Sequence, residues 1–337
     1  MVQSCFINDI RTDYEGNQVI SFEPISRKQH TRSTPLSKYE STTGDFAVFS
    51  WYQRGTGSFD PVNNDVVLYM DNVVCSYDEI NGKGTWMPVT TYFWPKNGKL
   101  TFSAYYPVGD VFAPNVNVDT KTGLKFNDYN IANAVDQKDL MFSSRTYDKS
   151  ASIHPDDFIT TYDGVDILFN HALSAISFTV KSRDDYNGVL LLKRIELIDV
   201  KHKGSFDENL TDGYAVNKSV WSVDDDNVDY KIYESTETYG TIIDMSGVVF
   251  TDANTGIVLP QVFDDNAKIR ITYYIKYGTD KYLEQVNDVK LKDLKKDGLV
   301  SLDAWEMGKW YKYNITFGLD QIYFAPAIEE WIDVIVR

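Results

Sequence analysis

The chain has few of the residues on which metal and disulfide chemistry depends. Its 337 residues include two cysteines and four histidines, and no CxxC or HxxxH spacing is present. At most one disulfide is therefore available, between Cys5 and Cys75, and a zinc site built on cysteine and histidine is not expected. We expect neither a metal ion nor a cofactor.

Positive charge and long apolar runs are also scarce. Lysine and arginine number 33 against 49 acidic residues, which gives a formal charge of −16. The nearest approach to a basic patch is Lys290–Lys296, where Asp293 interrupts the lysines. Such a chain repels the phosphates of nucleic acids and anionic membrane surfaces. No apolar run approaches the roughly 18 residues of a membrane-spanning helix, so membrane contact would need a lipid anchor.

Motifs of catalysis are missing as well. No GxSxG, GxGxxG or phosphate-binding loop occurs, and 49 acidic residues are too many for any one pair to indicate a hydrolase. His171 lies in an apolar, strand-like context and is expected to be structural. Asp225, Asn227 and Asp229 match the first positions of a calcium loop, but the glycine and glutamate that such a loop requires are absent. We expect no catalytic residues, no metal site and no enzyme.

Aromatic and β-branched residues are abundant, with 23 Tyr, 18 Phe and 7 Trp. They gather in short strand-like segments about ten residues apart, separated by Gly, Asn and Asp, a pattern typical of antiparallel sandwiches. The segments are Phe46–Tyr52, Lys99–Tyr106, Val165–Phe169, Ala175–Lys181, Val189–Val200, Gly256–Leu259, Lys268–Lys276 and Trp310–Phe317. The sequence therefore predicts an all-β protein.

Few helices are expected. Leu283–Lys296 is the best candidate, and Asp65–Asp78 fits a helix or a strand equally well. The polar, turn-rich stretch between Ser144 and Asp163 predicts a boundary between an N-terminal domain, residues 1–160, and a C-terminal domain, residues 164–337.

The first 45 residues differ from the rest. Gln18–Pro24 predicts one strand, with Val19, Ser21 and Glu23 on one face and Ile20 and Phe22 on the other. A polar run, residues 25–44, follows it, and a run of that length in a compact domain is usually functional or flexible. Val2–Cys5 resembles the end of a bacterial lipoprotein signal, although an ordinary thiol at Cys5 is an equally good interpretation from the tetrapeptide alone.

A series of motifs then appears in order along nearly the whole chain. They are FAVFSWY (46–52), GTW (84–86), TTYFWP (90–95), LTFSAYYP (100–107), DLMF (139–142), VDILFNHALSAISFTVK (165–181), WEMGKWYKYNITF (305–317) and IYFAPAIEEW (322–331). This series resembles the fimbrillin-like (Mfa-like) pilus subunits of Bacteroidales. The resemblance implies two tandem transthyretin-like antiparallel β-sandwich domains, exported as a lipoprotein to the cell surface and outer membrane.

The resemblance also implies an assembly route by donor-strand exchange with other fimbrial subunits. Cys5 would carry the lipid, and an arginine-specific protease would cut at Arg32, with Arg27 as second choice. Residues 1–32 would then leave as a removable leader, together with the strand that contains Val19, Ile20 and Phe22.

The donor strand implied by the resemblance is the C-terminal tail, residues 319–337. Its candidate anchors are Ile322, Phe324, Trp331 and Ile335, although their alternation is imperfect. If the tail completes its own domain instead, a terminal subunit is the better interpretation. The assembled fimbria would support adhesion to a host or bacterial surface ligand.

A second hypothesis remains open. The chain could be a surface carbohydrate-binding lipoprotein of a glycan-uptake system. That function would place two or three of the seven tryptophans together on one flat, exposed face.

Overall fold

The computed structural model describes residues 19–24, 43–63, 65–80, 83–109, 113–131, 137–150, 164–183, 188–210, 220–250, 254–296, 300–318 and 322–330. Across these ranges the chain is almost entirely β, with one 3-10 turn at Leu291–Asp293. Nearly all strand pairs are antiparallel, and β1–β10 and β12–β25 are parallel. The predicted all-β architecture is confirmed. Within the described ranges no helix is long and apolar enough to cross a membrane.

The largest sheet, called here the large sheet, has the order β10-β1-β4-β3-β2-β5-β8-β11, with β9 also pairing with β5. Its strands are β1 (Phe22–Pro24), β2 (Phe46–Gln53), β3 (Val66–Ile80), β4 (Lys83–Pro88), β5 (Lys99–Tyr106), β8 (Met141–Ser143), β9 (Thr146–Lys149), β10 (Val165–Ile167) and β11 (Phe169–His171). Every residue of β2 is buried, because both faces of this strand are covered.

The two faces of β2 belong to two different hydrophobic clusters. Phe46, Val48 and Tyr52 lie in an aromatic cluster that also holds residues of β1, β4, β5, β10 and β11. The ring of Phe46 contacts that of Phe169 on β11 at 5.5 Å. Residues of β10 and β11, the two end strands of the sheet, both belong to this cluster. The alternate residues Ala47 and Phe49 belong to a second, larger core.

A second sheet, the bridging sheet, has the order β15-β14-β7-β6. Its strands are β6 (Asn115–Asp119), β7 (Gly123–Asn130), β14 (Lys203–Asp207) and β15 (Val220–Val223). Phe126 on β7 stacks on Phe206 of β14 with ring centroids 5.0 Å apart. The bridging sheet thus joins strands from both sides of the domain boundary predicted near residue 160, and that division remains a prediction.

Two further sheets form a sandwich around the larger core. The tail sheet, β18-β12-β25-β26, faces the outer sheet, β16-β13-β20-β21, in which β17 also pairs with β13. The strands are β12 (Ser174–Ser182), β13 (Val189–Lys201), β16 (Asn227–Glu234), β17 (Thr241–Ile243), β18 (Gly256–Val258), β20 (Lys268–Gly278), β21 (Lys281–Lys290), β25 (Lys309–Phe317) and β26 (Ile322–Glu330). Small pairs are made by β19 (Gln261–Val262) with β24 (Ala304–Trp305) and by β22 (Lys295–Lys296) with β23 (Val300–Ser301).

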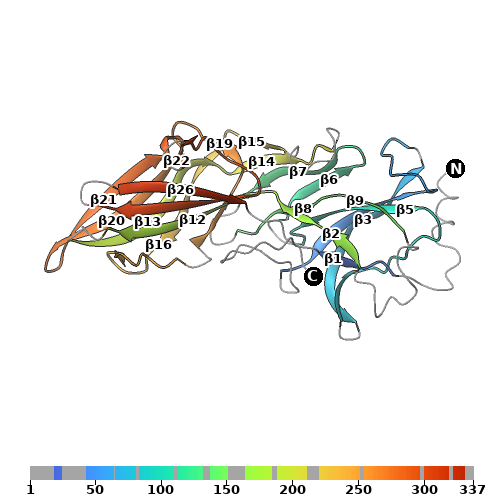
Figure 1. Ribbon diagram of the computed structural model, residues 1–337, viewed down its shortest axis with the longest axis horizontal. Helices are drawn as coiled ribbons and strands as arrows, with labels where there is room; N and C mark the ends of the chain where they lie inside the picture. The colour runs from blue at the N-terminus through green and yellow to red at the C-terminus, as the bar shows by residue number, and fades with distance from the viewer. Residues whose placement is uncertain are drawn as a thin grey trace.

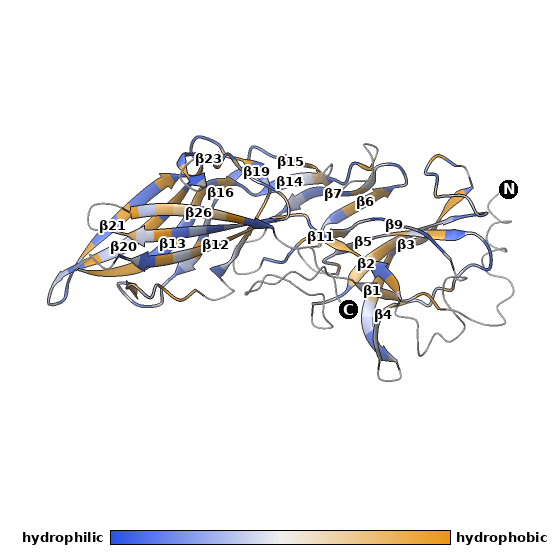
Figure 2. Cartoon of the chain, in the orientation of Figure 1, coloured by the Kyte–Doolittle hydropathy of each residue, from blue (hydrophilic) through white to orange (hydrophobic). Residues whose placement is uncertain are grey.

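These elements make an elongated molecule, with the large sheet at one end, the outer and tail sheets at the other and the bridging sheet between them (Figure 1). Strands of the outer sheet alternate hydrophobic and hydrophilic residues, as expected when one face packs and the other meets water (Figure 2). Strand β13 is such a case, because Leu192, Ile195 and Leu197 are buried whereas Arg194 and Glu196 are only partly buried.

The helix predicted over Leu283–Lys296 is therefore wrong. Lys281–Lys290 forms β21, paired with β20 from Gly278 back to Lys268, and only Leu291–Asp293 takes a helical turn. The pairing with a long neighbouring strand outweighs the local helix propensity of Leu, Glu and Lys. The ambiguous segment Asp65–Asp78 proves to be mostly strand, within β3.

Candidate functional site

The segment Val19–Pro24 occupies the position that the sequence assigned to a removable strand. Its strand β1 lies inside the large sheet, between β4 and β10. Phe22 is in register with Trp86 of β4, antiparallel, and with Val165 of β10, parallel. A strand taken from this place would leave unpaired backbone groups on both sides.

Backbone hydrogen bonds hold the segment along its length. The Ile20 N–H donates to the Tyr92 carbonyl at 2.8 Å, and the Val165 N–H donates to the Ser21 carbonyl at 2.8 Å. Val19 forms an isolated bridge with Phe93. These bonds would have to be remade by whatever replaced the segment, because unsatisfied buried backbone groups are destabilising.

Two apolar side chains anchor the segment in the aromatic cluster. Ile20 and Phe22 are fully buried. The Phe22 ring meets the rings of Phe46 and Phe102 edge to face, with centroids 6.1 and 5.5 Å apart. Full burial of each side chain contributes about 1.5–3 kcal/mol. Without them the floor of the resulting groove would be aromatic and apolar.

The predicted donor tail is described in part. Ile322–Glu330 forms β26, the edge strand of the tail sheet, in antiparallel register with β25 over nine positions. Ile322 and Phe324 are half-buried against the core of their own chain. Pro326 is tolerated because an edge strand leaves one side of its backbone unpaired. Trp331 and Ile335 lie outside the described residues.

Charged pairs add to the attachment of β26. Lys312 contacts Glu329 at 2.7 Å, and Lys309 pairs with Glu330. The acidic pair that interrupts the apolar pattern of the tail therefore faces lysines of β25. Cys5, Arg27 and Arg32, the predicted lipidation and cleavage residues, lie outside the described residues.

Other candidate residues take structural places. His171 Nδ1 lies 2.6 Å from Asp139 Oδ2, and both side chains are buried. Asp225 pairs with Lys201 at 2.8 Å. Among the described residues no group of three His, Cys, Asp or Glu side chains is arranged to hold a metal ion. Cys75 is a free thiol, and burial raises its pKa well above the ordinary value.

The six tryptophans that the structure describes do not form the exposed face that a glycan-uptake protein would need, and Trp331 lies outside the described residues. Trp51, Trp86, Trp94 and Trp305 are buried. Trp221 and Trp310 are partly buried, and each indole N–H donates a hydrogen bond within the chain.

Two buried charged residues, Glu208 and Arg145, lie near one another, and no motif in the sequence predicts their positions. Glu208 accepts a hydrogen bond from the Leu124 N–H at 2.8 Å, and burial raises its pKa to about 7. Nearby, the Arg145 guanidinium lies over the Trp51 ring at 4.6 Å and donates to the Thr120 carbonyl at 2.6 Å. Arg145 thus ties the turn after β6 of the bridging sheet to β2 of the large sheet, and Glu208 joins the end of β14 to β7, through contacts that strand patterns do not reveal.

The architecture defines a class of extended proteins built from β-sheet sandwiches. Within that class, the family model described as fimbrillin-like matches residues 31–331, and the chain belongs to this family. No curated protein sequence matches the chain.

Solved structures share the fold. A fimbrial protein from Bacteroides vulgatus has a TM-score of 0.63 at 16% identity, covering 94% of this chain and all of that one. A proposed cell adhesion protein from Bacteroides uniformis has a TM-score of 0.53 at 15% identity, covering 93% of this chain and 98% of that one.

Proposed function

We propose that the chain is a structural subunit of a cell-surface fimbria that supports adhesion and assembles by exchange of strand β1. Membership of the fimbrillin-like family supports a pilus subunit and a surface location. The observation that carries the exchange step is the position of β1 between β4 and β10, together with the burial of Ile20 and Phe22 in the aromatic cluster.

The exchange follows from the physics of the groove. A cut at Arg32, or at Arg27, severs the link between β1 and β2, so that β1 is held only by its own hydrogen bonds and its two buried side chains. Once β1 leaves, a strand from a neighbouring subunit satisfies the same backbone groups and covers the same aromatic floor. Because the donor and acceptor surfaces differ, each insertion leaves a further site open and a filament grows.

The donor in this proposal is the tail, residues 319–337. In the monomer β26 completes the tail sheet of its own chain against β25, with half-buried side chains. This arrangement meets the condition under which a terminal subunit is the better interpretation, so the tail serves as a donor only if β26 detaches from β25. In the membrane-attached precursor, Cys5 carries the lipid that anchors the chain to the outer membrane. The subunit performs no catalysis.

Limited digestion tests this proposal. Brief treatment with an arginine-specific protease should remove the leader and produce ladders of oligomers on a denaturing gel run without boiling. Arg32→Ala should abolish the ladder, with Arg27→Ala as the matched control. A protein that is cut near residue 32 and stays monomeric would contradict the proposal, and a ladder lost only in Arg27→Ala would move the cut to that residue.

A further inference from the structure

Three tyrosines cluster on the solvent side of the outer sheet. The rings of Tyr239 and Tyr282 are stacked with centroids 3.8 Å apart, and Tyr274 meets Tyr239 edge to face at 5.5 Å. Tyr274 lies on β20, Tyr282 on β21, and Tyr239 in the loop between β16 and β17. We call these three residues the tyrosine platform. The outer sheet that carries it lies at the end of the molecule opposite to β1 (Figure 1).

Strand register places further outward residues beside the platform. Leu191, Tyr274 and Glu284 stand opposite one another on β13, β20 and β21, and Ile242 of β17 continues that row. Ile242 is 58% exposed and Tyr239 is 40% exposed. Apolar surface therefore remains open to solvent around rings that are already fixed by contact with one another.

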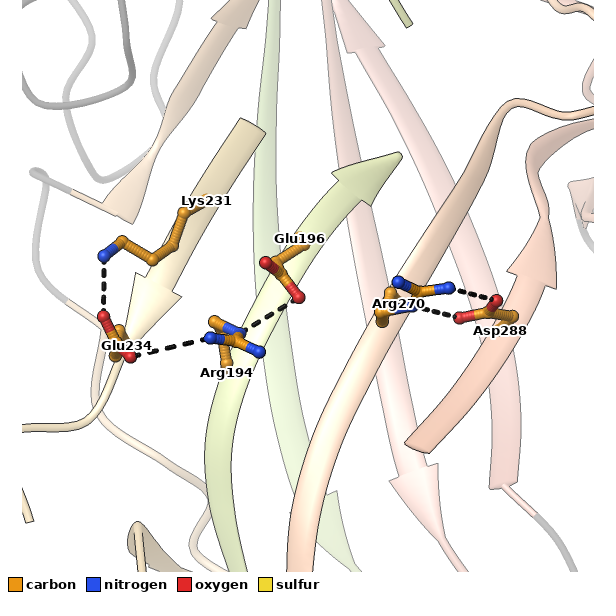
Figure 3. A network of polar contacts seen from close by, with 6 residues as sticks. All are labelled: Arg194, Glu196, Lys231, Glu234, Arg270 and Asp288. Atoms are coloured by element: carbon orange, nitrogen blue, oxygen red, sulfur yellow. Dashed lines mark hydrogen bonds and ion pairs between the residues drawn. The ribbon is translucent and has the colours of Figure 1, made fainter. Parts of the chain in front are cut away.

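A network of charged side chains covers the same sheet nearby (Figure 3). Arg194 contacts Glu196 at 3.0 Å and Glu234 at 3.8 Å, and Lys231 contacts Glu234 at 2.6 Å.

On the neighbouring strands, Arg270 binds Asp288 through two hydrogen bonds of 2.7 and 2.9 Å. The Arg270 bonds lower the pKa of Asp288 to about 2. The network in Figure 3 holds three cations and three anions, so its own charges balance on a chain whose formal charge is −16.

We propose that the tyrosine platform and its charged border bind a neutral oligosaccharide. A sugar ring presents an apolar face of C–H groups and a rim of hydroxyls. The C–H face suits the exposed part of Tyr239, since the Tyr282 ring already lies between Tyr239 and Lys276.

The hydroxyls of the sugar suit the acceptor positions that Glu284 keeps beside its bond from the Tyr274 hydroxyl. They also suit the guanidinium N–H groups of Arg270 that do not bind Asp288. Strands lie about 4.8 Å apart, close to the length of one sugar unit, so successive units of a glycan can meet successive strands.

Charge and pre-organisation favour this ligand over others. An ionic ligand gains little here, because each cation of the network already has an acidic partner and the chain as a whole repels anions. The core of a protein–protein interface is depleted of charged residues, whereas ion pairs are frequent on this face. Tyrosines are well suited to recognition because large, amphipathic rings lose little conformational entropy on binding. Rings and charges held by mutual contacts lower that entropic loss further.

The test uses the uncut, full-length monomer, so that its outcome is independent of strand exchange. The probe is a printed array of neutral gluco-, manno-, galacto- and N-acetylglucosamine oligosaccharides, followed by calorimetric titration of the best binder. The double variant that combines Tyr239→Ala and Tyr282→Ala should weaken the affinity for the oligosaccharide by roughly tenfold or more. Tyr77→Ala is the matched control, since Tyr77 on β3 is 43% exposed and belongs to the other end of the molecule.

Thermal unfolding shows whether the double variant is folded, and Tyr239→Ala alone carries the test if it is not. A protein that binds no oligosaccharide on the array overturns the proposal. Binding that survives these changes, or that falls equally in Tyr77→Ala, places the glycan elsewhere and also overturns it.

Discussion

The large sheet and the outer sheet are both built from β-strands, but they differ in how far their faces are buried. In the large sheet all eight residues of β2 are buried and the small strand β1 is enclosed by aromatic rings. In the outer sheet one face packs on the core and the other carries tyrosines and ion pairs in water. A strand that is enclosed on both sides would leave a groove with unpaired backbone groups if it were removed. A sheet with one face in water needs no such removal to present side chains to a ligand.

Truncating the anchor of β1 should give the largest effect. Phe22→Ala removes a fully buried ring from the aromatic cluster and should lower the free energy of unfolding by about 3–5 kcal/mol. The matched change Phe324→Ala, on the half-buried edge strand β26, should lower it by about 1–2 kcal/mol. Equal losses in urea unfolding would remove the distinction between an enclosed strand and an edge strand.

A rise in pH should have the next largest effect, through Glu208 beside the bridging sheet. Folding raises the pKa of Glu208 from 4.5 to about 7, because burial penalises its charged form. The folded state therefore binds this proton more tightly than the unfolded state. The resulting stability is complete below pH 4.5 and is lost as the pH rises through 7.

Glu208→Gln should remove this pH dependence, which amounts to about 3 kcal/mol. The measurement is urea unfolding of both proteins at pH 5 and pH 8. Identical changes with pH in the two proteins would show that Glu208 stays ionised inside the fold.

The smallest change in the free energy of unfolding is expected for a substitution in the outer sheet. Asp288→Asn should cost at most about 1 kcal/mol, and less in high salt, because its ion pairs are partly exposed. The folded pKa of Asp288 is about 2, so its contribution is present above 3.8 and is lost only as the pH falls towards 2. Between pH 5 and 8 the difference from wild type should be constant, in contrast to Glu208→Gln. A loss as large as that of Phe22→Ala would mean that this face is structural.

Pattern and composition predicted much of this fold, because strands with one buried face alternate visibly. Trp310–Phe317 is correctly predicted as a strand for that reason, since its buried and partly buried residues alternate. Lys99–Tyr106 is also a strand as predicted, but seven of its eight residues are buried, because both of its faces are covered. The strand at Leu283 was missed because its exposed residues are good helix formers and its partner β20 supplies the pairing. Register and packing decide such cases, and a single sequence does not display them.

The sequence predicted where the strand of the candidate site lies in the chain, but not which strands lie beside it. The alternation of Ile20 and Phe22 indicated a strand, but its place between β4 and β10 depends on pairing with residues distant in the chain. The tyrosine platform depends on a loop that brings Tyr239 against Tyr282, and no spacing in the sequence predicts that contact. The buried Glu208 was likewise one acidic residue among many.

The central claim is that the place of β1 is an acceptor for a donor strand, and a peptide tests it directly. The protein is cut by an arginine-specific protease, a synthetic peptide of residues 319–337 is added in excess, and the complex is weighed by native mass spectrometry. We predict one peptide bound to each cut protein, with the leader released and no peptide bound to uncut protein. A leader that stays bound after cutting, with no peptide taken up, would contradict the account.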